Sequence, residues 1–336
     1  ENLKQPRIIV TAEEAIKKLI ESKYYNESIP ICLLPNTDPF LNKTNIEYLK
    51  ELLYLIKQKQ LSNTFTIVTK CSIEEDFIKY VKKLKMDNQL IFYLSFSGLG
   101  KNIEKNIDIE KIKRNFEILH KNNLKIIHYF RPLIPENSSK EKIDEILDFV
   151  SKYTDCSVIT GLKIKEEYFD KIDFWKDIKE HKEECIRAEG VWVKSAFEYF
   201  YKNYKRNHQI FQTNSCALAT KIKIPRIEYY NSNECCNYNI CSDSQREKCK
   251  KCAKNISIKD LKNQIIIQLK KLDKYNEDVI INIGNPTILE NVKLEVGDLA
   301  YLTYMCHTKI IIKNKDSDDR YFNSSLNGSK PLILEG

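Results

Sequence analysis

The chain has 336 residues, of which 42% are hydrophobic, and a formal net charge of +8. With only 8 glycines and 9 prolines, the composition excludes a turn-rich sandwich and long disordered linkers. No stretch approaches the about 20 apolar residues of a membrane span, so we expect no membrane contact. Eleven cysteines without a secretory leader predict a reducing, cytoplasmic compartment, where clustered thiols bind metals more often than they form disulfides.

Helices and strands alternate through the first half. Thr11 and Glu14 form a capping box that predicts a helix over 11–24, and an apolar run over 29–34 predicts a short buried strand. Thr44 with Glu47, Ser72 with Glu75 and Ser138 with Glu141 predict the starts of helices over 44–60, 73–85 and 140–152. A further helix is expected over 109–122, and strands over 65–69, 90–94, 124–130 and 157–159. This alternation predicts a parallel α/β sheet with right-handed crossovers, which we interpret as an open or partial (β/α) barrel.

Polar residues collect where these strands end. They are Asn36, Thr37 and Asp38, then Thr69 and Lys70, then Ser95 and Ser97, then His128 and Arg131, and last Lys163. The carboxyl ends of parallel strands face the same way, so these groups are expected to converge on a ligand. Gly98, Gly100 and Gly161 lie at the same ends, where glycine lets the backbone approach a ligand closely. Asn-Thr-Asp-Pro is also an ordinary turn sequence.

The order of four motifs resembles the radical SAM superfamily, in the branch of spore photoproduct lyase. These motifs are Thr-Asp-Pro-Phe at 37–40, Thr-Lys at 69–70, Ser-Phe-Ser-Gly-Leu-Gly at 95–100 and Arg-Pro-Leu-Ile-Pro at 131–135. The resemblance covers roughly residues 5–165. It implies a radical SAM-like barrel that binds S-adenosylmethionine and a [4Fe–4S] cluster, and that receives electrons from a donor such as flavodoxin or ferredoxin.

The resemblance also implies residue roles. The amino group of S-adenosylmethionine is held by residues that correspond to Asn36, Thr37 and Asp38. Its carboxylate and ribose are held by residues that correspond to Lys70, Ser95, Ser97 and Arg131. The stretch that flanks the adenine corresponds to the backbone over 161–164, which includes Lys163. A zwitterionic ligand needs an acidic group for its ammonium ion and a cation for its carboxylate, for which arginine offers a planar fork. Cys71 lies beside this site and is a candidate hydrogen-atom donor, or simply the residue before the Ser72 cap.

The family signature C-x3-C-x2-C, whose thiolates hold the cluster, is absent. We expect the cluster loop to lie upstream of the sequence shown, or the chain to be a degenerate member that never held the cluster. As shown, the chain should not cleave S-adenosylmethionine. With the loop, the enzyme would generate a 5′-deoxyadenosyl radical that abstracts hydrogen, and the net charge and the resemblance favour nucleic acid as its substrate.

The second half carries a helical segment over 166–212 that is rich in aromatic and basic residues. It is either a base-stacking surface with Lys202, Lys205 and Arg206 on phosphates, or a core of aromatic side chains beside a solvated basic face; we favour the core. Over 213–255 the spacing Cys236-x4-Cys241-x7-Cys249-x2-Cys252 predicts a four-thiolate site for zinc or an auxiliary [4Fe–4S] cluster, with Cys235 able to replace Cys236 and Cys216 able to join.

Residues 256–336 predict a small α+β module, or extra elements that close the barrel. A helix is expected over 257–275, strands over 279–284 and 309–313, and a structural Cys306-His307 pair. Two rival functions remain. One is a degenerate barrel whose four-cysteine zinc site is structural and which binds nucleic acid without catalysis. The other is a barrel enzyme that uses a different nucleotide, which would explain the polar loops but neither the motif order nor the cysteine cluster.

Overall fold

The computed structural model describes residues 8–188, 190–223, 257–284, 286–308, 310–313 and 331–336. The chain divides into two compact units, each made of two stretches of sequence. Unit 1 comprises 1–129 and 146–155, and unit 2 comprises 130–145 and 156–336. Strand β4 and helix α5 each contribute residues to both units.

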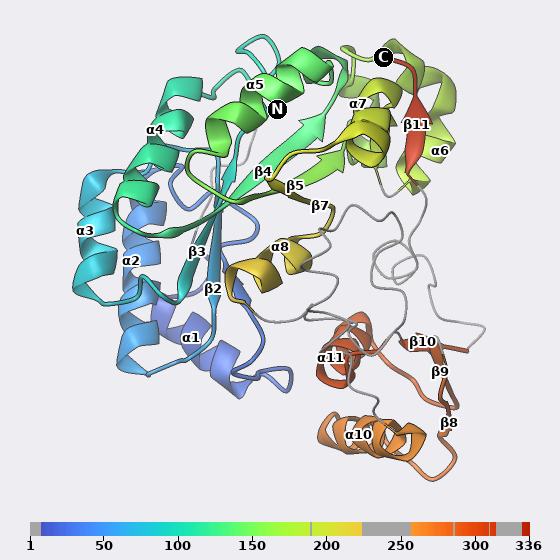
Figure 1. The fold of residues 1–336 in the computed structure, drawn as a ribbon. Helices are drawn as coiled ribbons and strands as arrows, with labels where there is room; N and C mark the ends of the chain where they lie inside the picture. Colours follow the sequence, from blue (N-terminus) through green and yellow to red (C-terminus); the bar gives the residue numbers. More distant parts are fainter. Residues whose placement is uncertain (1–7, 189, 224–256, 285, 309, 314–330) are drawn as a thin grey trace. The chain divides into compact units, whose positions relative to one another are not determined.

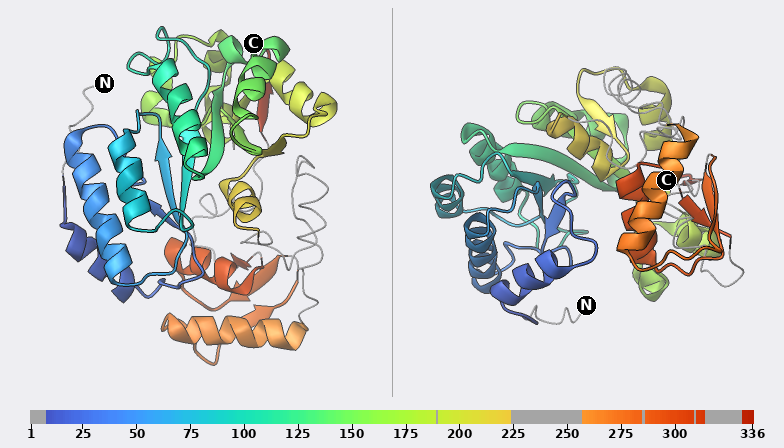
Figure 2. Two further views of the ribbon diagram at one scale, coloured as in Figure 1. Left: turned by 60° about the vertical axis from the view of Figure 1, so that its left-hand side comes forward. Right: turned by 90° about the horizontal axis from the view of Figure 1, so that it is seen from below.

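Unit 1 is built from repeated strand–helix pairs. Its elements are α1 Ala12–Glu21, β1 Ile31–Leu33, α2 Lys43–Gln58, β2 Phe65–Thr69, α3 Glu75–Lys83, β3 Leu90–Ser95, α4 Ile109–Lys121, the start of β4 Lys125–Leu133 and the end of α5 Lys140–Val150. The strands pair in parallel, β1 with β2, β2 with β3 and β3 with β4. Helices α2, α3 and α4 lie side by side along one face of β2 and β3 (Figure 1), and Figure 2 shows the same layer from two other directions. The predicted α/β alternation is therefore confirmed in this unit.

Unit 2 holds the remaining strands and shorter helices. Its elements after β4 are η1 Pro135–Asn137, β5 Cys156–Gly161, η2 Glu166–Lys171, η3 Lys176–His181, α6 Lys182–Arg187, β6 Val191–Val193, α7 Lys194–Glu198, η4 Tyr199–Asn203, β7 Gln209–Phe211, α8 Asn214–Lys221, α10 Ile258–Lys271, β8 Ile280–Asn282, β9 Thr287–Glu290, α11 Val296–Cys306, β10 Ile310–Ile312 and β11 Leu332–Leu334. Strands β1, β2, β3, β4, β5 and β7 follow one another in a six-stranded parallel sheet. Strand β11 pairs with β6, and β10, β9 and β8 form a separate sheet.

Amphipathic periodicity and burial explain why these segments adopt these elements. Every residue of β3 is buried, as the continuous apolar run over 90–94 predicts for an inner strand. Thr11 caps α1 through a hydrogen bond from the backbone N–H of Glu14, and Ser257 caps α10 through a bond from Asp260. These two predicted helix starts are confirmed.

Three other predicted helix caps are wrong, although α5 begins at Lys140 as predicted. Asn42, not Thr44, caps α2, since its side-chain oxygen accepts the N–H of Asn45 at 2.8 Å, and asparagine is the stronger cap. Helix α3 begins at Glu75 because the N–H of Ile73 bonds the side chain of Asn115 instead of a helical partner.

At the start of α5, Ser138 donates its hydroxyl to the carbonyl of Pro135, while Ser139 accepts the N–H of Lys142 at 3.2 Å. Ser139 therefore takes the capping position that the sequence assigned to Ser138. The expectation of a buried first strand also fails in part, because β1 lies at the end of the sheet order and Cys32 is exposed.

Candidate functional site

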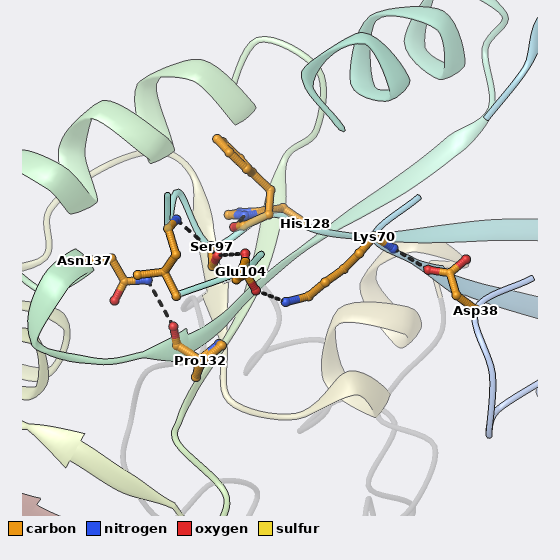
Figure 3. A network of polar contacts seen from close by, with 9 residues as sticks. Asp38, Lys70, Ser97, Glu104, His128, Pro132 and Asn137 are labelled. Atoms are coloured by element: carbon orange, nitrogen blue, oxygen red, sulfur yellow. Dashed lines mark hydrogen bonds and ion pairs between the residues drawn. The ribbon is translucent and has the colours of Figure 1, made fainter. Parts of the chain in front are cut away.

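The candidate site lies in unit 1, on the loops that follow β1, β2 and β3, and Asp38 is its anchor. The carboxylate of Asp38 accepts the hydroxyl of Thr69 at 2.7 Å and the backbone N–H groups of Lys70 at 2.7 Å and Phe40 at 2.9 Å. These bonds fasten the loop after β1 to the end of β2 (Figure 3). Asp38 thus contacts the backbone of Lys70, whose side chain extends away from it toward Glu104 (Figure 3).

Cys71 follows directly after this contact. Burial, the negative charge of Asp38 and hydrogen bonding to it raise the pKa of Cys71 to about 12. One oxygen of the Asp38 carboxylate accepts the bonds from Thr69 and Phe40, and the other accepts the N–H of Lys70. A carboxylate offers about four lone-pair positions, so the oxygen that Lys70 binds can also accept a ligand's ammonium ion.

Lys70 and Ser97 hold a second carboxylate, that of Glu104. The ammonium group of Lys70 forms an ion pair with one oxygen of Glu104, and the hydroxyl of Ser97 donates to the other at 2.7 Å (Figure 3). The side chains of Lys70 and Glu104 are 32% and 13% exposed, so this pair is partly shielded from water. The arrangement joins the ends of β2 and β3 through a residue in the loop before α4.

The other residues that the sequence predicts for the site in unit 1 include Ser95, Asn36 and Thr37. Ser95 ends β3, and its buried hydroxyl has no hydrogen-bond partner among the residues that the structure describes. Asn36 is exposed, while the hydroxyl of Thr37 accepts the amide of Asn45 at 3.3 Å. An orphaned buried hydroxyl is unusual, which makes Ser95 a candidate ligand contact.

Arg131 and Lys163 belong to unit 2 and are described within it. Arg131 is half-buried in β4, and Lys163 is exposed after β5. Gly161, expected to give a ligand room, serves the fold: a Cβ there would meet the carbonyl oxygen of Val191 at 2.3 Å. Its backbone is close to β6, which explains the glycine without a ligand.

His128, predicted to stand with the polar strand ends, is instead a core residue of unit 1. It is fully buried between Phe96 and Phe116, and its Nε2–H donates to the carbonyl of Phe96 at 2.8 Å. The reason is positional: His128 lies in the middle of β4, which the structure extends to Leu133, beyond the predicted end at 130.

Three supporting residues escaped the sequence analysis. Asn45 donates to the carbonyl of Asp38 at 2.8 Å, and Asn115 on α4 binds both Cys71 and Ile73. Glu104 is the third. The sequence pattern that could have identified the two asparagines is an amide on the otherwise apolar face of an amphipathic helix. Glu104 lies in an irregular loop, where no such pattern marks it.

The aromatic segment of unit 2 packs as a core. Its buried rings are Phe169, Trp175, Trp192, Tyr199 and Phe200. The favoured interpretation, core aromatics, is confirmed for these side chains, and rings so enclosed cannot stack on bases.

The metal prediction lies largely outside the described residues. Cys235, Cys236, Cys241, Cys249 and Cys252 all fall in 224–256, while Cys216 is buried on α8. Across the described ranges, no group of three or more His, Cys, Asp and Glu side chains could hold a metal ion. Cys306 is buried, and burial raises its pKa to about 12, which agrees with the predicted structural role. None of the described helices combines the length and the apolar character that crossing a membrane requires.

Comparisons with known proteins identify no family. No protein-family model and no curated protein matches the chain. One solved structure that matches is a type I 3-dehydroquinate dehydratase from Clostridium difficile, crystallised with covalently modified comenic acid. The two chains are 17% identical, the match covers 60% of this chain and 69% of that one, and the TM-score is 0.33. So low a similarity carries no argument about function.

Proposed function

We propose that the chain is a radical SAM-like protein whose partial (β/α) barrel binds S-adenosylmethionine at the loops after β1, β2 and β3. The single observation that carries this proposal is the carboxylate held by Lys70 and Ser97. These two residues belong to the set that corresponds to the family's contacts with the ligand's carboxylate and ribose, and here they bind the carboxylate of Glu104. Glu104 thus stands in the place of the methionine carboxylate.

The rest of the ligand has matching partners in the same loops. The methionine ammonium ion would bind the Asp38 carboxylate at the oxygen that accepts the N–H of Lys70, because a charged N–H donor binds a carboxylate strongly. Ser95 offers an unpartnered buried hydroxyl for a ribose oxygen. In this protein Asp38 would therefore orient the ligand while also fixing the two loops.

The described residues do not fit the main [4Fe–4S] cluster, because they offer no group of three thiolates. We therefore derive no cleavage step and propose binding alone for the described residues. Catalysis on a nucleic acid, with electrons from a flavodoxin or ferredoxin, belongs to a protein that also supplies the cluster ligands. A degenerate, non-catalytic nucleic-acid-binding module stays the alternative.

Calorimetric titration with S-adenosylmethionine tests the proposal through the Glu104→Ala variant. Removing Glu104 frees Lys70 and Ser97, so we expect affinity to rise roughly tenfold, the value of one charge-assisted hydrogen bond. Lys70→Met should weaken binding by a similar factor. Glu110→Ala is the matched control, since Glu110 is a solvent-exposed acid paired with Lys113 on α4.

Two outcomes would overturn the proposal. One is the absence of measurable binding in the wild type and in Glu104→Ala alike. The other is an equal affinity in Glu104→Ala, Glu110→Ala and the wild type, which would mean that Glu104 does not occupy the ligand's place.

A further inference from the structure

A polar pocket lies in unit 2. Its volume is about 320 Å³, and it is lined by Lys140, Tyr199, Asn203, Lys205 and Arg206. This volume is at the lower end of the range for small-ligand sites and suits a phosphate with its sugar. The residues come from the first position of α5, from η4 and from the turn that follows η4.

The charges in this pocket favour an anion. Three of the five lining side chains are cations, and Asp144 supplies an acid beside them, through an ion pair with Arg206 at 2.9 Å. Among the described residues, Lys140 and Lys205 form no ion pair, and both are exposed. The pocket therefore keeps an excess of positive charge.

Asp144 holds two of the side chains that line the pocket. This residue receives the hydroxyl of buried Tyr199 as well as the guanidinium group of Arg206, whose side chain is 30% exposed. Asp144 thereby fixes the planar fork of Arg206 at the pocket, which lowers the entropy lost when the fork binds an anion. Asn203 adds an amide that can donate to an oxygen.

Not every basic side chain of this segment lines the pocket, as Lys202 shows. It lies in η4 beside Asn203, yet it pairs with Glu198 at 2.9 Å and is not part of the lining. Lys202 is thus a surface lysine whose charge is already neutralised. Lys205 and Arg206, by contrast, line the cavity together with Lys140. Lys140 comes from a stretch about 60 residues earlier in the chain, so this division follows from the fold.

We propose that this pocket binds a backbone phosphate of a nucleic acid. This inference rests on the proposed function, because it takes a nucleic acid as the partner. It adds that unit 2 contacts a phosphate of that partner, whereas the proposed S-adenosylmethionine site lies in unit 1. Lysines and arginine around one cavity match the strong oxygen acceptors of a phosphate diester. The buried aromatic rings beside the pocket stabilise the fold, so the contact carries no base selectivity.

The experiment compares two double variants by fluorescence anisotropy of a labelled single-stranded oligonucleotide over a series of salt concentrations, without S-adenosylmethionine. One is Lys140→Ala with Lys205→Ala. The other, Lys152→Ala with Lys202→Ala, removes the same charge from exposed positions outside the pocket. We expect the pocket variant to bind about tenfold more weakly at low salt and to lose about 0.7 of salt slope for each phosphate contact.

Competition by inorganic phosphate supplies the second arm. We expect phosphate to displace the oligonucleotide from the wild type, and more weakly from the pocket variant. Equal losses in the two double variants would overturn the proposal, since they would reflect net charge alone. Phosphate binding that depends on Lys140 and Lys205, with oligonucleotide binding unchanged, would also overturn it and assign the pocket to a small anion. Neither readout depends on the titration of Glu104→Ala, so the two proposals fail separately.

Discussion

At the scale of single residues, Asp38 shows how one side chain can belong both to the fold and to a site. Its carboxylate accepts hydrogen bonds from Phe40, Thr69 and Lys70, and its negative charge helps to raise the pKa of Cys71. The carboxylate therefore fixes two loops whether or not a ligand is bound. Replacing Asp38 would confuse loss of structure with loss of binding, which is why Glu104 and Lys70 are the better positions to vary.

The raised pKa of Cys71 leads to a prediction about its reactivity. Only the thiolate is nucleophilic, and a pKa of about 12 leaves almost none of it near neutral pH. We expect iodoacetamide to modify exposed Cys32 well before Cys71, as peptide mass spectrometry would show. Equal rates of modification at Cys32 and Cys71 would contradict the raised pKa of Cys71.

The same thiol should make stability depend on alkaline pH. Its pKa is about 9 in the unfolded chain and about 12 in the fold, so the unfolded state loses its proton first as the pH rises. The contribution of Cys71 is complete below about pH 9 and disappears as the pH approaches 12. Urea unfolding of the wild type and of Cys71→Ala should therefore converge over this range, while buried Cys306 affects both proteins alike. A gap that widens with pH would show that the sign is wrong.

At the scale of elements, Asn115 joins helix α4 to the loop that carries the candidate site. Its side chain is 1% exposed; it donates to the carbonyl of Cys71 and accepts the N–H of Ile73, both at 2.8 Å. The loop after β2 therefore keeps its course because a helix on the neighbouring strand–helix unit satisfies its backbone.

Asn115→Ala should leave both backbone groups unpaired in a buried place. We expect the free energy of unfolding to fall by about 2 to 4 kcal/mol, measured by urea denaturation. Asn102→Ala, at an exposed loop position, is the control and should change stability little. Equal stability of the two variants would mean that water replaces the amide of Asn115.

The junction of β5 with β6 yields a second prediction for elements. At Gly161 a Cβ would meet the carbonyl oxygen of Val191 at 2.3 Å and the ring of Trp192 at 2.7 Å. Gly161→Ala should therefore destabilise the protein by about 1 to 3 kcal/mol in thermal or urea unfolding. Gly100→Ala is the matched control, because nothing lies within 4 Å of a Cβ built there. If Gly161→Ala is as stable as the wild type, the close approach to Val191 does not explain the glycine. The expectation from the sequence, that Gly161 gives a ligand room, would then stand again.

At the scale of the whole molecule, the chain passes back and forth between its compact units. Residues 146–155 belong with 1–129, although 130–145 belongs to the other unit. Phe149 in the returning stretch contacts Phe96 and Phe116, and Thr154 donates to the carbonyl of Ile126 at 2.7 Å. A chain that ended at 129 would therefore lack part of the core of unit 1.

Metal analysis is the prediction for the complete chain. If Cys236, Cys241, Cys249 and Cys252 form a four-thiolate site, anaerobically purified protein should contain either iron and sulfide, with a broad absorption band near ~400 nm, or one colourless zinc ion. Cys249→Ser with Cys252→Ser should lose the metal, and Cys32→Ser, at an exposed thiol, should keep it. Wild-type protein without iron or zinc would contradict the predicted site.

The sequence by itself determined the strand–helix alternation, because buried strands and amphipathic helices impose distinct hydrophobic periods on the chain. It also placed Asp38, Lys70 and Ser97 at neighbouring strand ends, since carboxyl ends of parallel strands share one edge. Only the tertiary structure decided what these groups bind: Glu104 carries no local signal, yet its carboxylate reaches Lys70 and Ser97. Likewise, the burial of His128 and the meeting of Lys140 with Arg206 depend on contacts distant in the chain, which no local pattern records.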